Sequence, residues 1–170
     1  LFRLACRVSA KRLFPNFSFL DSSFNKQFYV PGDFATEVGY MGCRTRVLAN
    51  VCGPSVTPGR GNLSFTSINL PRIGIKHGIC LGERTKADMK GFYKELDDMM
   101  DLVKGQLLQR FECQCSKSSA NFKFLLGSHV WLNSEKLEGH KIRTVLKHGT
   151  LSIGFIGLAE TLKALIGEHH

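Results

Sequence analysis

The sequence lacks any apolar run of about eighteen residues, the length that a helix needs to cross a bilayer, so we expect no membrane span and no membrane partner. It also lacks the cysteine spacing of a disulfide framework or a zinc site. Cys113 and Cys115 have no matching second pair, whereas zinc sites normally combine two pairs. We therefore expect no metal site, and the cysteines indicate a reducing, cytoplasmic compartment.

Acidic residues are scarce: 14 stand against 23 lysines and arginines, which gives a formal charge of +9. This charge allows anionic partners such as nucleotide phosphates, nucleic acid or an acidic protein surface. The alternative is a fragment separated from acidic neighbours that balance it. Residues 1–14 contain four basic residues and no acid, which a transit peptide could also show; we interpret them as an internal helix with a basic face.

The clearest secondary-structure signal is a stripe of apolar residues over 85–111 at three- and four-residue steps, which predicts a helix that can brace the outside of a barrel. Thr85, with Asp88 three residues later, is its expected N-terminal cap. Strands are predicted over 62–70 and 150–155, with a helix over 158–166. Weaker strand predictions fall on 27–30, 122–126 and 130–132.

The segment Val38–Val47 is apolar and β-branched, with Cys43 in its middle. Gly39 and Gly42 allow backbone conformations that other residues resist. The pattern predicts a strand, a loop that presents the thiol, and a second strand. A buried structural cysteine within a strand is the alternative, because a free cysteine packs as a small hydrophobe.

A second candidate site lies near the end of the chain. Gly154 and Gly157 are predicted to bracket a turn between a strand and a helix. Free N–H groups at a helix N-terminus can bind an anion, so Gly154, Phe155, Ile156 and Gly157 are candidate substrate contacts. A tight connection that needs glycine only for packing is the alternative.

Four strings together carry a resemblance to a known family: PNFSFLDSSFN at 15–25, MGCRTRV at 41–47, GRGNLSFTSINLPRIG at 59–74 and HGTLSIGFIGLAETLKAL at 148–165. The sequence resembles the anaerobic, class III ribonucleoside-triphosphate reductases, which are glycyl-radical enzymes. The resemblance implies an α/β fold, with residues 1–170 forming part of a ten-stranded barrel whose central finger loop carries a cysteine. The family's N-terminal nucleotide-sensing domain and its C-terminal glycyl-radical and zinc region have no counterpart in this sequence.

The resemblance also implies roles for three residues. Cys43 is the expected thiyl site, Met41 matches the methionine two residues before it, and Asn62 matches an asparagine on the neighbouring strand. The implied reductant is formate or a thiol. A glycyl radical on a region outside this sequence is the implied cofactor, whereas the zinc of the full-length family is not expected here.

The implied substrate is a ribonucleoside triphosphate. The implied protein partners are a radical-SAM activating enzyme with an iron–sulfur cluster and, at full length, a second copy of the chain. We expect residues 1–170 alone to be inactive. One alternative is a pyruvate formate-lyase type enzyme, but that type presents two adjacent cysteines, whereas Gly42 and Arg44 flank Cys43. The other is a basic nucleic-acid-binding module, which rests only on the charge; no nucleic-acid partner is expected.

Overall fold

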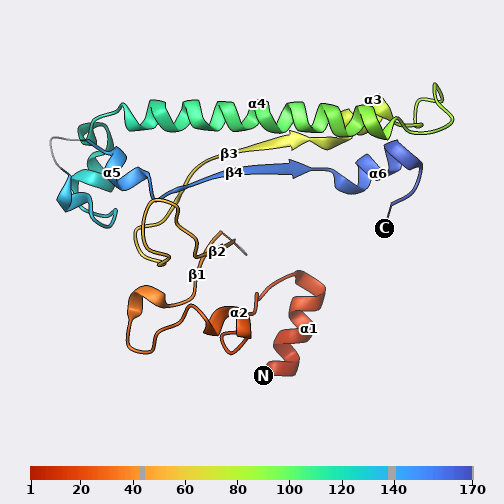
Figure 1. Ribbon diagram of the computed structural model, residues 1–170. Helices are drawn as coiled ribbons and strands as arrows, with labels where there is room; N and C mark the ends of the chain where they lie inside the picture. Colours follow the sequence, from red (N-terminus) through yellow and green to blue (C-terminus); the bar gives the residue numbers. More distant parts are fainter. Residues whose placement is uncertain (43–44, 138–140, 170) are drawn as a thin grey trace.

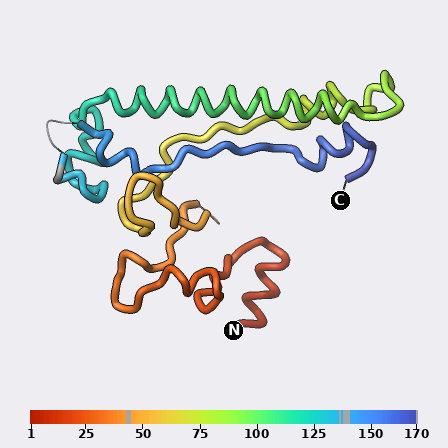
Figure 2. The backbone as a smooth tube through the Cα atoms, viewed as in Figure 1, coloured from red at the N-terminus to blue at the C-terminus, as the bar shows by residue number. Residues whose placement is uncertain are grey.

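The computed structural model describes residues 1–42, 45–137 and 141–169. Its elements form two parts (Figure 1). A long helix lies along a parallel strand pair, with two shorter helices at one end. The N-terminal third lies on the other side of the strand pair and consists of short helices, turns and a small hairpin. The tube in Figure 2 shows that the chain passes from this third into the strand pair through one loop and does not return.

The N-terminal third contains little regular structure. Helix α1 (Phe2–Arg12) confirms the helix predicted for the first residues, and it is followed by α2 (Ser23–Lys26) and the 3-10 turn η1 (Phe34–Thr36). The strand expected at 27–30 is wrong. Local bonds already use its backbone: the Tyr29 N–H donates to Lys26 O, and the Val30 N–H donates to Thr36 Oγ1. These backbone N–H groups are therefore used in turns and not in the hydrogen-bond ladder of a sheet.

The hairpin β1 (Gly39–Met41) and β2 (Thr45–Val47) is antiparallel, with Gly39 opposite Val47 and Met41 opposite Thr45. It confirms the two strands predicted around Cys43. Val47, at the end of β2, is buried.

Strands β3 (Asn62–Asn69) and β4 (Thr150–Ile156) pair in parallel, with Asn62 opposite Thr150 and Asn69 opposite Ile156. Both strands were predicted from the sequence. A parallel pair needs a long crossover, because both strands must start at the same end of the sheet. The crossover here runs through residues 70–149 and contains most of the helical structure.

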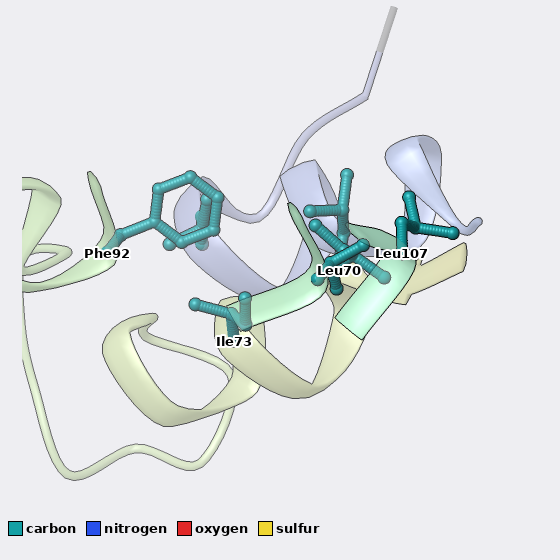
Figure 3. Close-up of a cluster of buried hydrophobic side chains, with 7 residues drawn as sticks. Leu70, Ile73, Phe92 and Leu107 are labelled. Atoms are coloured by element: carbon teal, nitrogen blue, oxygen red, sulfur yellow. The ribbon is translucent and has the colours of Figure 1, made fainter. Parts of the chain in front are cut away.

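Helix α4 (Met89–Cys115) covers one face of the pair and spans about 40 Å at about 1.5 Å per residue. Val103 and Leu107 from α4 pack with Ile68 of β3 in the main core. Phe92 of α4 and Leu70 and Ile73 of α3 (Leu70–His77) belong to the same core, and Figure 3 labels these three together with Leu107. The predicted helix is confirmed, but its start is wrong. Asp88 is itself the cap and accepts the Gly91 N–H at 2.9 Å, because that helix begins at Met89.

Helices α3 (Leu70–His77) and α6 (Leu158–Ile166) follow directly after the two strands and pack against each other. The contact is close because glycine lies at two of its positions. A Cβ on Gly74 would lie 3.0 Å from Thr161 O, and one on Gly78 would overlap Ala164 O. The Ala164 carbonyl instead accepts the N–H groups of Ile79 and Cys80.

The segment between α4 and β4 contains three short turns and one short helix: η2 (Ser119–Phe122), η3 (Lys123–Gly127), η4 (Ser134–Lys136) and α5 (Arg143–Leu146). The strands predicted at 122–126 and 130–132 are wrong. From these runs, Leu126 instead forms a small second core with Ile142 and Leu146, and Phe122 and Trp131 pack against it. A short apolar run fits a strand and a helical turn equally well, so its periodicity could not separate them.

The fold is mixed α/β, as predicted, and each of its two sheets has two strands within the described residues. The side chains of Thr66 and Ile68 face α4: Thr66 bonds to Gln106, and Ile68 is buried. Because side chains alternate along a strand, those of Phe65 and Ser67 point to the opposite face of the sheet. Phe65 is 71% exposed there. No helix among the described residues has both the length and the apolar character needed to cross a membrane.

Candidate functional site

Cys43, the predicted thiyl position, lies outside the described residues, so its role stays a prediction. Its described neighbours are consistent with a turn. Met41 ends β1 and is half-buried, and Gly42 has φ +63°, with no atom of the described residues within 4 Å of the position of an added Cβ. A positive φ is a conformation that glycine adopts at little cost, so the hairpin uses Gly42 as its first turn residue.

Arg46 of β2 connects the hairpin to α2 by a hydrogen bond. The Arg46 guanidinium donates to Asn25 Oδ1 at 3.2 Å and also to the Val47 carbonyl. Asn25 is buried and in turn donates to Phe19 O at 2.8 Å. These bonds connect the hairpin to α2, which is part of one of the strings that carried the family resemblance.

A second set of bonds connects the hairpin to the parallel strand pair. The Arg60 guanidinium donates to Leu48 O at 3.1 Å and to Ala49 O at 2.7 Å, directly after β2. Its Nε donates to His148 O at 2.7 Å, just before β4. Asn50 Nδ2 and His148 Nδ1 lie 3.1 Å apart. We call Arg60, Asn50 and His148 the hairpin clamp.

The hairpin clamp imposes a protonation state on His148. Asn50 Nδ2 can only donate, so His148 Nδ1 must accept and the ring must be neutral. Burial, together with the charges of Lys147 and Arg60, lowers the pKa of His148 below its ordinary value. The neutral ring is therefore the stable form near neutral pH.

Asn62 is the first residue of β3 and is exposed. It lies opposite Thr150, whose N–H donates to Gly61 O at 2.7 Å. The strand pair therefore starts at Asn62, one residue beyond Gly61 and two beyond Arg60. The structure thus brings the exit of the hairpin and Asn62 to the same end of the strand pair.

A small apolar cavity of about 160 Å³ opens beside Asn62 and is also lined by Trp131 and Gln114. Trp131 Nε1 and Gln114 Oε1 are buried without a hydrogen-bond partner among the described residues. The ring of Trp131 explains why residue 61 is glycine, because a Cβ there would lie 2.8 Å from Trp131 Cη2.

The second candidate site differs from its prediction in one respect. Gly154 does not belong to the turn: it lies within β4 opposite Ser67, because the strand continues to Ile156. Phe155 and Ile156 end the strand and are exposed. Gly157 alone makes the turn, with φ +72°, and it is the N-cap of α6.

The electrostatics of this turn are mixed. The first N–H groups of α6 give it a partial positive charge. Glu160 lies in that first turn, and its Oε2 would be 3.4 Å from a Cβ on Gly157. An anion bound here would have to displace this carboxylate.

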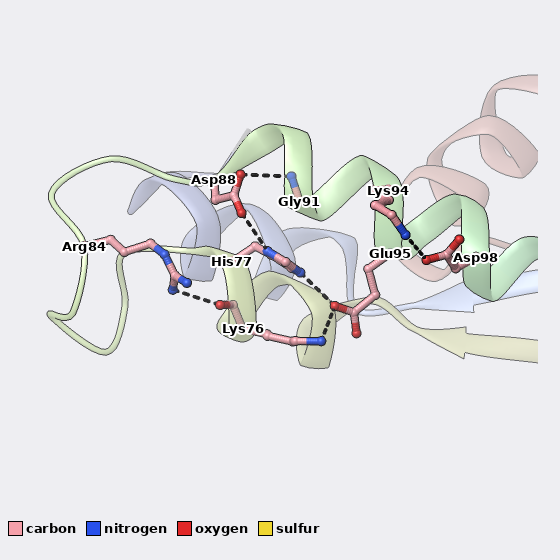
Figure 4. A network of polar contacts seen from close by, with 8 residues as sticks. All are labelled: Lys76, His77, Arg84, Asp88, Gly91, Lys94, Glu95 and Asp98. Atoms are coloured by element: carbon pink, nitrogen blue, oxygen red, sulfur yellow. Dashed lines mark hydrogen bonds and ion pairs between the residues drawn. The ribbon is translucent and has the colours of Figure 1, made fainter.

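A further polar network lies where α3 meets α4 (Figure 4) and includes none of the predicted site residues. His77 bonds Glu95 Oε2 at 2.7 Å and Asp88 Oδ2 at 3.3 Å, and Lys76 Nζ pairs with the same Glu95 oxygen at 2.6 Å. The backbone bond from Gly91, with the bond from His77, lowers the pKa of Asp88. The network connects the end of α3 to the start of α4. Within the described ranges, no three histidine, cysteine or acidic side chains come together as a metal site.

Sequence reasoning missed the hairpin clamp. His148 has no ligand spacing, and the glycines on both sides of Arg60 match no phosphate-binding motif. The one available signal was an arginine between two glycines immediately before a predicted strand.

The parallel strand pair with its crossover helices places the chain in the α/β class, and the cysteine hairpin lies at the starting end of that pair. Residues 1–170 match the sequence profile described as anaerobic ribonucleoside-triphosphate reductase, and the chain belongs to that family.

Curated relatives of the same description come from three bacteria. The identity is 30% over 175 residues to the protein of Escherichia coli and 28% over 172 residues to that of Salmonella typhimurium. It is 26% over 171 residues to the protein of Haemophilus influenzae. Each match covers 99% of this chain but only 22% of the relative, so the chain spans about a fifth of their length.

Proposed function

We propose that this chain is the part of an anaerobic ribonucleoside-triphosphate reductase that carries the radical cysteine, Cys43, and presents it to the ribose of the substrate. The observation that supports this most is the clamped hairpin. Its two strands flank Cys43, and Arg60 bonds its exit to the end of the sheet where Asn62 lies. Family membership over all 170 residues supports the same assignment.

The reaction needs an unpaired electron on Cys43, which the stored glycyl radical of the family supplies from a segment outside these 170 residues. The Cys43 thiyl takes the hydrogen from C3′, forming an S–H bond and leaving a carbon radical. The 2′-hydroxyl then takes up a proton and leaves as water. Formate, oxidised to carbon dioxide, or a pair of thiols, oxidised to a disulfide, supplies two electrons, which together with one proton form a new C2′–H bond in place of the lost hydroxyl. Cys43 finally returns a hydrogen to C3′.

Positioning is the main contribution of this chain, because holding reacting groups at the correct distance can remove a large part of the barrier. Met41 would support the loop from the end of β1. Asn62 would face the reductant and the sugar from the start of β3, since its exposed amide can both donate and accept hydrogen bonds. The β4–α6 turn around Gly157 would contact the substrate, although Glu160 does not favour a bare phosphate there.

The open surfaces of the chain fit a piece of a larger barrel. Phe65, Phe155 and Ile156 are all more than half exposed, and both strands of the parallel pair have a free edge among the described residues. Exposed apolar patches and free edges normally mark an interface. We propose that further strands of a ten-stranded barrel cover them. We further propose cytoplasmic location, a homodimer and the radical-SAM activating enzyme as partner.

The test is a chimera in which residues 1–170 replace the matching segment of the Escherichia coli relative. After anaerobic activation, we expect the chimera to form deoxyribonucleoside triphosphate. Cys43→Ser should abolish product, whereas Cys52→Ser, at an exposed cysteine in the following loop, should not. The glycyl-radical signal in electron paramagnetic resonance reports whether each chimera is folded and activated. Undiminished product from Cys43→Ser would contradict the proposal.

A further inference from the structure

We infer that Arg60 is a positioning residue for the hairpin that flanks Cys43: it sets where the exit of β2 lies relative to Asn62. This inference rests on the proposed function, because the position of the hairpin has chemical consequences only if Cys43 reacts. The inference begins from three backbone carbonyls, those of Leu48, Ala49 and His148, which lie outside every helix and strand.

Arg60 reaches segments that are far apart in sequence. Leu48 and Ala49 precede it by 12 and 11 residues, and His148 follows it by 88. The first two leave β2, and the third leads into β4. One side chain therefore fixes the hairpin exit against the start of the strand that pairs with β3. Without it, the hairpin and the strand pair would be connected at this point mainly by the loop 50–59.

The geometry requires arginine. A guanidinium carries five N–H donors in a rigid plane, and each of its three nitrogens here donates to a different carbonyl. A lysine ammonium keeps the charge but is a single point on a flexible stem, so it cannot hold three separated carbonyls in place.

The backbone on both sides of Arg60 is also fixed. Gly59 has φ +73°, which other residues rarely adopt, and Gly61 lies against the Trp131 ring so closely that a Cβ would not fit. Arg60 therefore extends from a constrained backbone, which limits the volume that its guanidinium can explore. His148 adds the bond to Asn50, so that two side chains connect the same two segments.

The experiment measures the position of Cys43 directly. The five other cysteines are changed to serine, and nitroxide labels are placed on Cys43 and on Ser67→Cys, an exposed position of β3. Pulsed dipolar spectroscopy then gives the distribution of distances between hairpin and strand. We expect one narrow distance with native Arg60 and loss of that narrow distance in Arg60→Lys and Arg60→Met.

Arg84→Lys is the matched control. Arg84 also donates to a backbone carbonyl, that of Lys76 at 2.9 Å, but it lies at the α3–α4 end of the molecule. Its substitution should leave the distribution narrow. A second label pair, Ser67→Cys with Leu102→Cys on α4, reports whether the strand pair and helix remain folded. Arg60 variants that broaden both pairs would show general destabilisation and would overturn the inference, as would an unchanged hairpin distance.

A kinetic arm separates this inference from the proposed function. In the chimera, Arg60→Lys should lower kcat and leave KM for the ribonucleotide nearly unchanged, because a displaced thiol weakens the chemical step and not binding. If the chimera with native Arg60 stores the radical but makes no product, while the distance still depends on Arg60, the proposed function fails and the positioning role stands. If product forms and Arg60→Lys changes neither distance nor kcat, the positioning role fails.

Discussion

Replacing Gly157 by alanine tests whether the β4–α6 turn, the second candidate site, is built as the structure shows. Two costs add. An L-residue held in the left-handed region costs about 1–2 kcal/mol. The added Cβ would overlap Pro71 Cγ, an atom of a rigid ring in α3, and overpacking of this kind costs about 1–3 kcal/mol. The sum is a loss of about 2–5 kcal/mol in the free energy of unfolding.

The assay is urea unfolding followed by circular dichroism at low protein concentration. At a slope of about 2 kcal/mol per molar urea, the midpoint should fall by about 1–2.5 M. Gly154→Ala is the matched control, because Gly154 has no positive φ and its added Cβ would lie 3.2 Å from Ser67 Oγ, on an exposed side chain that can rotate. We expect it to change stability by less than about 1 kcal/mol. Equal effects of the two substitutions would refute the reasoning about the turn.

Three further predictions concern the core, the hairpin clamp and the open face. Leu107→Ala, at a side chain 2% exposed, should cost about 2–5 kcal/mol in urea unfolding, whereas Leu108→Ala, at the exposed neighbouring position, should cost far less; similar losses would contradict the assignment of the buried stripe. Folding lowers the pKa of His148, so the neutral ring stabilises the folded chain. This contribution to the free energy of unfolding should be complete above the pKa of the unfolded chain, about 6.5, and should be lost as the pH falls through the pKa of the folded chain. The unfolding midpoint should therefore drop more between pH 7.5 and 5.5 with His148 than in His148→Gln, and parallel drops would remove the proposed linkage. Phe65→Lys should reduce concentration-dependent association in analytical ultracentrifugation, because it puts a charge on the uncovered sheet face. Unchanged association would show that the chains do not associate through this face.

The elements that the sequence predicted correctly are those with a strong local pattern. The apolar stripe through Val103 and Leu107 needs only helical periodicity to be recognised, and the strand that ends before Pro71 is marked by the proline. The start of α4 was misplaced because Asp88 and Thr85 are both good capping residues, and only the structure shows which one bonds to a free N–H.

What the sequence could not predict is non-local. The parallel pairing of β3 with β4 joins residues 87 or 88 positions apart, and no local pattern records its register. The same holds for Arg60, whose three acceptors are backbone carbonyls; any residue could supply them, so they leave no signature in the sequence. The strand predictions for the short apolar runs near Trp131 were wrong for the opposite reason: their structure depends on local hydrogen bonds. One of these is the bond from Trp131 N–H to Leu125 O.

The central claim is that Cys43 performs the radical step on the ribose. It is tested most directly by supplying the activated chimera with ribonucleotide tritiated at C3′ and measuring tritium released to water. With native Cys43 we predict release of the fraction of tritium that exchanges from the Cys43 S–H into water before the hydrogen returns to C3′. With Cys43→Ser we predict none, although both store the glycyl radical. Release that persists in Cys43→Ser at the native rate would contradict the account, because the hydrogen would then be removed by a different group.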